Sequence, residues 1–504
     1  MKVAIIKDDT MDYCRDAPFH PSVKYPEYPF GDCSGKNVPY DRVRELFHSM
    51  GMDRANYGKE TWNPLGEVIK PGMNVFIKPN FVRDYNHVGG VECMITHGSL
   101  IRVMLDYAYI ALQGNGHITI GDSSYLDADF DRIVHITGTD KIVEYFNNSS
   151  GMRVDLIDLR QYQGHVRLIG GVERRTRPGD PLGYSIVDLG KDSDHYGIIG
   201  DYKKFRNGYY DRNEMAKHHN SEKNEYCIAN SILNADVILN VPKLKTHSKA
   251  GMTCGLKSLI GINGLKDWLP HHRSGSAETG GDDYIHKDFR KDWLVRLRDE
   301  QVVTDNMLRI MPARALSAVV LFSRKLAPFK DKYEAGGWYG NDTITRTVSD
   351  LNKIVYYADR QGKMRRTLQR KEFFVVDGIV AGEREGPLIP VPKKAGLLVA
   401  GFNPVEIDLV CSRIMGFDHR KMPVFKHAMG SKKYPFFTGR PEDIEIVSEK
   451  CSTFEEVFEA YNSHFIPPDG WVGHIEYEAQ PSAAPSIGTQ PSGMVMVPPL
   501  KHDV

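Results

Sequence analysis

Lysine side chains gather with a histidine and small residues in one stretch of the sequence, Lys243–Lys257. Ammonium groups bind carboxylate or phosphate as point charges, and a hydroxyl adds a directional hydrogen bond. Where burial lowers the pKa of such a lysine, its neutral amine becomes a base or a Schiff-base nucleophile. We therefore interpret the stretch as an anion-binding loop, with the lysines on a turn before a helix over Gly255–Ile260. Its candidate residues are Lys243, Lys245, His247, Thr253 and Lys257.

A buried strand precedes this loop. Val237–Val241 is short, apolar and β-branched, which is typical of a strand inside a parallel sheet. Pro242 should end the strand, because proline cannot donate to the ladder. A second predicted strand, Asn74–Lys78, leads to Lys78 and Asn80. Since ligands of open α/β sheets bind at the carboxyl ends of strands, we expect these two residues to converge with the lysine loop.

Acid–base candidates follow other predicted strands. Asp122 and Asp377 each come after a short apolar run, and together they could act as acid and base or bind a divalent cation; turn and cap roles are the alternative. His247 could carry a proton near neutral pH or pin the turn. The adjacent His271 and His272 are further metal-ligand candidates, although the metal itself stays unknown. The catalytic candidates are Lys257, His247, Asp122 and Asp377.

Three blocks of the sequence resemble the DUF362 family, which is named for its unknown function, over most of residues 75–416. The blocks are Lys78-Pro79-Asn80, Pro242–His247 with Thr253 and Lys257, and Asp377-Gly378 running to Gly386-Pro387. More distantly, His247 followed by Gly255 and Lys257 is similar to the loop of the lactate racemase type. That likeness implies a lysine that carries a nickel-pincer nucleotide and a downstream histidine that ligates nickel. The chain departs from it by having Cys254-Gly255-Leu256 where those proteins have a more regular Gly-Gly.

Composition limits the classes of protein to consider. The 504 residues include 65 Lys and Arg and 65 Asp and Glu, so no global charge favours nucleic acid or an anionic membrane as a partner. The first apolar run, VAII, is too short for a signal peptide or a spanning helix, which predicts a cytoplasmic protein. The seven cysteines form no CxxC pair and no iron–sulfur motif. The iron–sulfur domains associated with some DUF362 relatives are therefore not expected here.

Alternating strand and helix patterns predict an α/β fold with a parallel or mixed sheet flanked by helices. We expect a core from residues 1–270 and 371–477, in which 160–220 form an inserted β-rich flap. Residues 271–370 should provide a loop and a helical cap, and the Pro- and Ser-rich residues 478–504 a disordered tail. Among the predicted helices are Ser99–Leu112 with Thr96 as its N-cap, Asn224–Asn234, Gln301–Leu326 and Thr343–Tyr357.

These patterns favour an enzyme that holds a small carboxylate- or phosphate-bearing substrate or cofactor on the lysine loop for proton or group transfer. A non-catalytic binding or assembly protein that uses the same loop is one alternative. A metal or nickel-pincer cofactor racemase, or a redox enzyme, is another. A closed pocket with lysines of lowered pKa would indicate an enzyme, and an open, solvated lysine face a binder. The sequence contains no P-loop, no GxGxxG after a strand and no GxSxG elbow.

Overall fold

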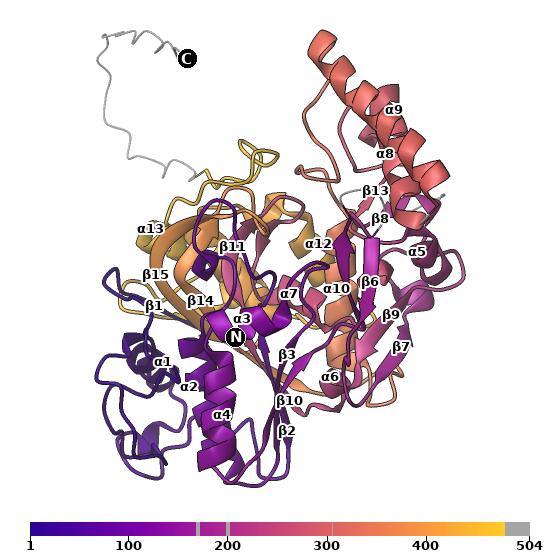
Figure 1. The fold of residues 1–504 in the computed structure, drawn as a ribbon. Helices are drawn as coiled ribbons and strands as arrows, with labels where there is room; N and C mark the ends of the chain where they lie inside the picture. Colours follow the sequence, from indigo (N-terminus) through magenta and orange to yellow (C-terminus); the bar gives the residue numbers. More distant parts are fainter. Residues whose placement is uncertain (168–171, 198–201, 305, 479–504) are drawn as a thin grey trace, which may run out of the picture.

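One mixed sheet organises the protein. The computed structural model describes residues 1–167, 172–197, 202–304 and 306–478, and within these ranges ten strands form the main sheet. Figure 1 shows this sheet with helices packed around it. Along the sheet the strands are β16 (Glu445–Val447), β1 (Lys2–Lys7), β15 (Val391–Gly401), β14 (Lys371–Glu383), β10 (Val237–Val241), β2 (Asn74–Pro79), β3 (His117–Asp122) and β4 (Val154–Asp158); β11 (Lys243–His247) and β12 (Gly251–Thr253) branch from β14.

Strand β10 lies near the middle of the sheet, and this position explains why its sequence is apolar apart from Asn240. It pairs in parallel with β2 on one side and β14 on the other, and all five of its residues are buried. Strands β2, β3 and β4 continue the parallel part, whereas β14, β15 and β1 are antiparallel neighbours. The α/β prediction is therefore confirmed, and the sheet is mixed.

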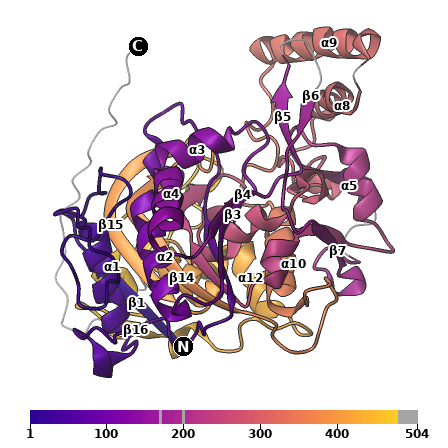
Figure 2. The same cartoon turned by 60° about the horizontal axis from the view of Figure 1, so that its bottom comes forward.

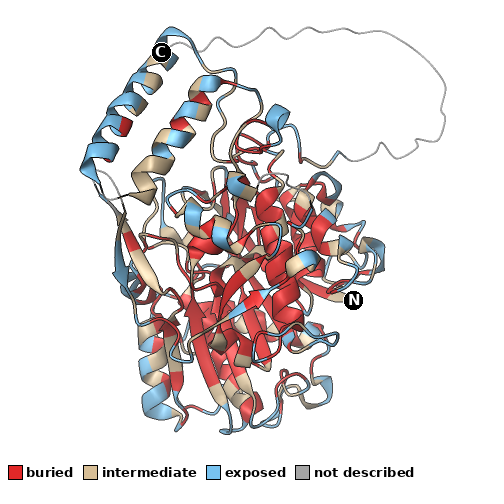
Figure 3. Ribbon diagram, turned by 90° about the vertical axis from the view of Figure 1, so that its right-hand side faces the viewer, coloured by how far each residue is buried: buried red, intermediate tan, exposed pale blue. Residues whose placement is uncertain are grey.

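Helices cover both faces of the sheet, because successive strand residues point to opposite sides. Leu239 packs in the core formed with α1, α2 and α4, whereas Ile238 packs in a second core that includes α10. Figure 3 shows these two buried layers in red. The longer helices are α1 (Val38–Ser49), α2 (Gly98–Leu112), α4 (Thr139–Ser149), α8 (Phe289–Val303), α9 (Met307–Leu326), α10 (Thr343–Tyr357), α11 (Pro404–Met415) and α12 (Pro423–Gly430). The shorter ones are α3 (Phe130–Ile136), α5 (Arg212–His218), α6 (Asn230–Asn234), α7 (Gly255–Ser258) and α13 (Val457–Tyr461).

The lysine loop is not a turn. Residues Lys243–His247 form β11, which runs beside β14, so the chain re-enters the sheet directly after Pro242. The prediction of a turn was wrong, because the chain pairs with β14 again directly after Pro242 and every residue of β11 is buried. Strand β12 then pairs with β11 and places Thr253 opposite Lys245.

Two further local predictions need correction. The segment predicted as a helix over Asn224–Asn234 is a strand, β9 (Glu225–Ala229), followed by the short α6. Its Tyr, Cys and Ile pair with β7 (Tyr184–Asp188), and this tertiary partner decides the conformation. The N-cap of α2 is His97, whose ring accepts from Ser99 N at 3.2 Å. Thr96 instead joins two strand ends, accepting from Asn80 N and donating to Val241 O.

The insert and the cap differ in how they attach to the core. Residues 160–220 include the strands β5 (Tyr162–Val166), β6 (Val172–Thr176), β7 and β8 (Phe205–Arg206), and β8 pairs with β13 (His272–Arg273). Helix α10, which was predicted as part of a cap, is instead a buried core helix, because its residues from Thr343 to Tyr357 are almost entirely enclosed. Helices α8 and α9 project from the body as a hairpin (Figure 2). The tail predicted for residues 478–504 lies, after its first residue, outside the described residues.

No helix in the described ranges is both long and apolar enough to cross a membrane.

Candidate functional site

A cavity of about 460 Å³ opens at the carboxyl edge of the sheet. Its walls come from the segments that follow β2 and β3, from β11, β12 and α7, and from the tip of the β14–β15 hairpin at Glu385–Ile389. The insert contributes residues 207–210. The side chains that carry charge or hydrogen-bonding groups into the wall are Asn80, Arg83, Asp122, Ser123, Lys245, His247, Lys249, Thr253, Lys257, Lys266 and His271.

Lys257 is the most exceptional of these side chains. It lies on α7, and its side-chain amine forms no hydrogen bond and no ion pair among the described residues, whereas Lys78 and Lys243 each pair with a carboxylate. Enclosure within the protein lowers its pKa well below the usual lysine value, and the charges of Lys245, Lys266 and Lys249 lower it further. A lowered pKa raises the share of neutral amine, which is the form that can accept a proton or attack a carbonyl carbon.

Three other lysines face the same cavity. Burial lowers the pKa of Lys245 to about 7, and its amine donates to the carbonyl of Met94. Burial likewise lowers the pKa of Lys266 to about 7 and that of Lys249 to about 8. Lys266 donates to Ile260 O at 2.8 Å. None of the three has a carboxylate within ion-pair distance in the described part of the chain, so the cavity holds uncompensated positive charge whenever these amines are protonated.

Lys78 is paired rather than open to the cavity. Its amine lies 2.7 Å from Asp122 Oδ1, and both side chains are buried. The other oxygen of Asp122 accepts from Phe81 N at 2.6 Å. Gly261 makes room for this pair, because a Cβ there would collide with Asp122 Oδ1 and lie 2.7 Å from Lys78 Nζ. Asp122 therefore lines the cavity, whereas Lys78 lies behind it and does not.

Lys243 points away from the cavity. Its amine pairs with Asp377 Oδ2 at 2.9 Å and donates to the Tyr13 hydroxyl at 2.7 Å. Tyr13 in turn donates to Asp377 Oδ1, and His97 N donates to Oδ2. The four residues form a closed and fully satisfied network, and neither Lys243 nor Asp377 lines the cavity. The structure therefore separates them from the other predicted site residues.

Hydroxyl groups add neutral binding capacity. Thr253 Oγ1 and Ser123 Oγ are buried without a hydrogen-bond partner among the described residues, and both residues line the cavity. Asn80 lines it as well. A buried hydroxyl without a partner costs free energy, so these positions are prepared to bond a polar ligand.

Each of the three candidate histidines has a lowered pKa. His247 Nδ1 accepts from the backbone N–H groups of Lys249 and Ala250, which fixes the turn between β11 and β12. Burial and the charge of Lys257 hold the pKa of His247 well below its usual value, and burial does the same for His271 and His272. The described residues contain no group of three or more His, Cys, Asp or Glu side chains that could hold a metal ion. Asp122 and Asp377 belong to two separate lysine pairs.

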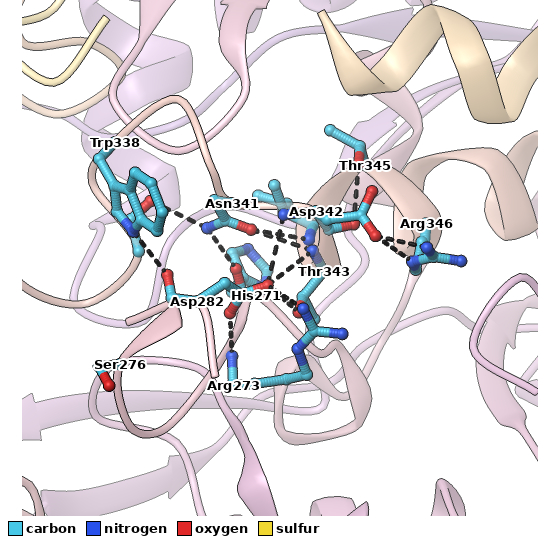
Figure 4. A network of polar contacts seen from close by, with 12 residues as sticks. His271, Arg273, Ser276, Asp282, Trp338, Asn341, Asp342, Thr343, Thr345 and Arg346 are labelled. Carbon is cyan, nitrogen blue, oxygen red and sulfur yellow. Dashed lines mark hydrogen bonds and ion pairs between the residues drawn. The ribbon is translucent and has the colours of Figure 1, made fainter. Parts of the chain in front are cut away.

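Carboxylates outside the cavity hold its walls in place. Asp408 on α11 accepts from Gly255 N at 2.6 Å and Leu256 N at 3.2 Å, which fixes the start of α7 and so the position of Lys257. Figure 4 shows a second such centre, where Asp282 accepts from Thr343 N and Oγ1 at the start of α10. Asn341 in the same network donates to His271 O at 3.0 Å, so the loop after α7 is anchored to α10.

Sequence reasoning missed several residues of the cavity. Lys266 follows Lys257 by nine residues, and its proximity in sequence was a usable signal. Ser123 follows Asp122 directly and could have been included for the same reason. The contributions of residues 207–210 and 385–389 had no such signal, because only the tertiary fold brings the insert and the hairpin tip to the lysines.

An α/β protein with a lysine-lined cavity at the edge of its sheet is the class that fold and site define. Residues 194–413 match the model of DUF362, described as a domain of unknown function, and this match supports the predicted family over that part of the chain. The matched part includes Lys243, Lys245, Lys257 and Asp377. It does not support the likeness to the lactate racemase type.

Other comparisons add little. No curated protein matches the chain. A crystal structure of a Thermotoga maritima protein, determined by the Northeast Structural Genomics Consortium, is similar over 72% of this chain and 55% of that one, with 12% identity and a TM-score of 0.28. The chain thus spans about half the length of that protein. A likeness this low indicates neither a shared fold nor a shared function.

Proposed function

We propose that this protein is an enzyme that binds a small carboxylate- or phosphate-bearing molecule in the lysine-lined cavity and uses an unprotonated lysine for proton or group transfer. The observation that carries the proposal is the Lys257 amine, which faces the cavity without a partner among the described residues and has a pKa well below the lysine norm. An ordinary binding site for an anion needs protonated lysines only. A lysine whose pKa lies well below the usual lysine value supports chemistry in addition to binding.

The roles follow from charge and position. Lys245 and Lys249, with pKa values of about 7 and 8, are the amines that can carry a proton at neutral pH and attract the anion. Thr253 and Ser123 would orient it through their unpartnered hydroxyls. Lys257 would then take a proton from the bound molecule or add to its carbonyl group. Asp122, paired with Lys78, contributes a carboxylate to the cavity wall.

Anion binding can be tested with sulfate and succinate as probes, by calorimetry on the full chain. Lys257→Met keeps most of the aliphatic stem, so the protein should fold, and Lys245→Met and Lys249→Met remove the charges proposed to hold the anion. Loss of one charge-assisted contact should weaken binding by roughly tenfold to a hundredfold. Lys217→Met, at an exposed lysine of α5, is the matched control and should bind as the parent does.

Catalytic use of Lys257 needs a separate measurement. Trace acetylation with acetic anhydride, followed by mass spectrometry of the Lys257 peptide, reports the fraction of neutral amine at each pH. We expect half-maximal reactivity well below the pH at which Lys217 reacts, because burial lowers the pKa of Lys257 and pairing with Glu214 raises that of Lys217. If the two lysines titrate together while sulfate still binds, the protein is a non-catalytic anion binder.

A further inference from the structure

Helix α9 has a large apolar face directed away from the protein. Its buried residues, Ile310 and Ala313, lie against α8. On the opposite side, large apolar residues recur at spacings of three and four, which places them on one face of the helix. They include Leu308 (85% exposed), Met311 (51%), Val319 (63%), Phe322 (61%) and Leu326 (81%).

The α8–α9 hairpin presents this face at the outer edge of the molecule. Figure 2 shows α9 lying beyond α8, with α8 between it and the body. Exposed residues also dominate α9 in Figure 3. Helix α8 adds Phe289, 71% exposed, and Trp293, 50% exposed, one turn apart. An apolar surface of this extent on a projecting element indicates a binding partner.

The charge of the hairpin selects the kind of partner. Helix α9 carries Arg309, Arg314, Arg324 and Lys325 and no acidic residue in its 20 positions. Of the acidic residues of α8, Glu300 pairs with Arg309 of α9, whereas Asp299 pairs with Arg206 and Arg212 of the insert and Asp292 accepts from the Tyr284 hydroxyl. The outer helix is therefore apolar and basic, on a chain whose formal net charge is zero.

We propose that α9 docks on the surface of an anionic lipid bilayer, with its axis in the plane of the interface. A helix with basic residues beside an exposed apolar face binds in this way, because its apolar side chains enter the acyl boundary while its cations face anionic headgroups. A second copy of the chain is a poorer partner, because two such helices would bring eight basic residues together. The sequence-based expectation of no membrane partner came from the net charge of the whole chain, which hides a local basic helix.

Vesicle co-sedimentation of the full chain tests the proposal. The vesicles are pure phosphatidylcholine and phosphatidylcholine with roughly a quarter phosphatidylserine, which gives an anionic surface. The protein should sediment with the anionic vesicles and be released by salt. Phe322→Glu with Leu326→Glu should weaken this partitioning by at least roughly tenfold, since two large apolar side chains no longer enter the interface.

The control is Leu182→Glu with Leu368→Glu, at two exposed leucines outside the hairpin, which should partition as the parent does. Melting temperatures of both double variants establish that they fold. Equal sedimentation with neutral and anionic vesicles, equal loss in the two double variants, or no sedimentation at all overturns the proposal. A dimer by light scattering that only the α9 variant dissociates, without vesicle binding, would identify the face as an interface between copies and would also overturn it.

Discussion

Replacing Lys245 by Met should change the stability of the protein in opposite directions at low and high pH. Burial, helped by the charge of Lys243, lowers the pKa of Lys245 to about 7, whereas a lysine in the unfolded chain has a pKa of about 10.4. Between these values the unfolded chain binds more protons than the native protein, so the contribution of Lys245 to the free energy of unfolding rises with pH. Methionine removes this dependence.

The magnitude follows from the pKa difference. Each pKa unit corresponds to about 1.4 kcal/mol, so the Lys245 ammonium should destabilise the native protein by on the order of 4 kcal/mol at neutral pH, and this cost should vanish near pH 10. The variant also loses the hydrogen bond that the amine donates to Met94 O, which should cost about 1 to 3 kcal/mol at every pH. The variant should therefore be the more stable protein near pH 7 and the less stable one near pH 10.

Urea unfolding of both proteins at intervals between those two pH values measures the difference directly. The difference between variant and parent cancels the titration of all other groups. Lys217→Met is the control, because pairing with Glu214 raises the pKa of Lys217, so that its contribution stays constant below the unfolded pKa and is lost only above it. A Lys245 difference that is the same at both ends of the range would refute the reasoning, since it would mean that the amine keeps its proton inside the protein.

Three further results are expected. Sulfate, whose own charge is constant, should bind at least roughly tenfold more weakly at pH 9 than at pH 6, because the amines with pKa values of about 7 and 8 lose their protons. Calorimetry at the two pH values measures the change, and an affinity that does not depend on pH would contradict the prediction. Lys78→Met should destabilise the protein by about 3 to 5 kcal/mol, because it leaves Asp122 buried and unpaired. In urea unfolding, the double variant with Asp122→Asn should recover part of this loss of stability. An equal or larger loss in the double variant would show that the two side chains do not act as a pair. Gly261→Ala should lower the melting temperature by several degrees through its collision with that pair, unlike Gly430→Ala, where a Cβ meets nothing within 4 Å; a similar small change in both would mean that the wall gives way freely.

The positions of several strands of the main sheet could be predicted from the sequence, because a buried strand requires a short run of apolar residues. Val237–Val241 is apolar at every position except Asn240, which is typical of a strand buried on both faces. The same reasoning failed for Glu225–Ala229, where pairing with β7 outweighs local helix propensity. It also failed for β11, because a strand with buried lysines contradicts the usual preference of that residue for solvent.

The lysines themselves illustrate what sequence pattern cannot distinguish. Lys243 and Lys245 are two residues apart on one strand and look alike in the sequence, yet only Lys243 reaches a carboxylate, that of Asp377. The separation depends on strand β14, which meets β11 with an irregular register between these two lysines. No local feature of the lysine stretch encodes that register.

The lysines at this edge of the sheet are therefore of two kinds, those paired with a carboxylate and those without such a partner. Lys78 and Lys243 are neutralised by Asp122 and Asp377, so they hold strand ends together, and their replacement should affect stability before binding. Burial lowers the pKa of Lys78 and Lys243 too, but the carboxylate beside each one offsets part of that cost. Lys245, like the other unpaired lysines of the cavity, has no such partner, so burial of its ammonium weakens the fold. A cluster of destabilising amines around a shared cavity is the arrangement expected where binding of an anion, rather than folding, supplies the compensating charge.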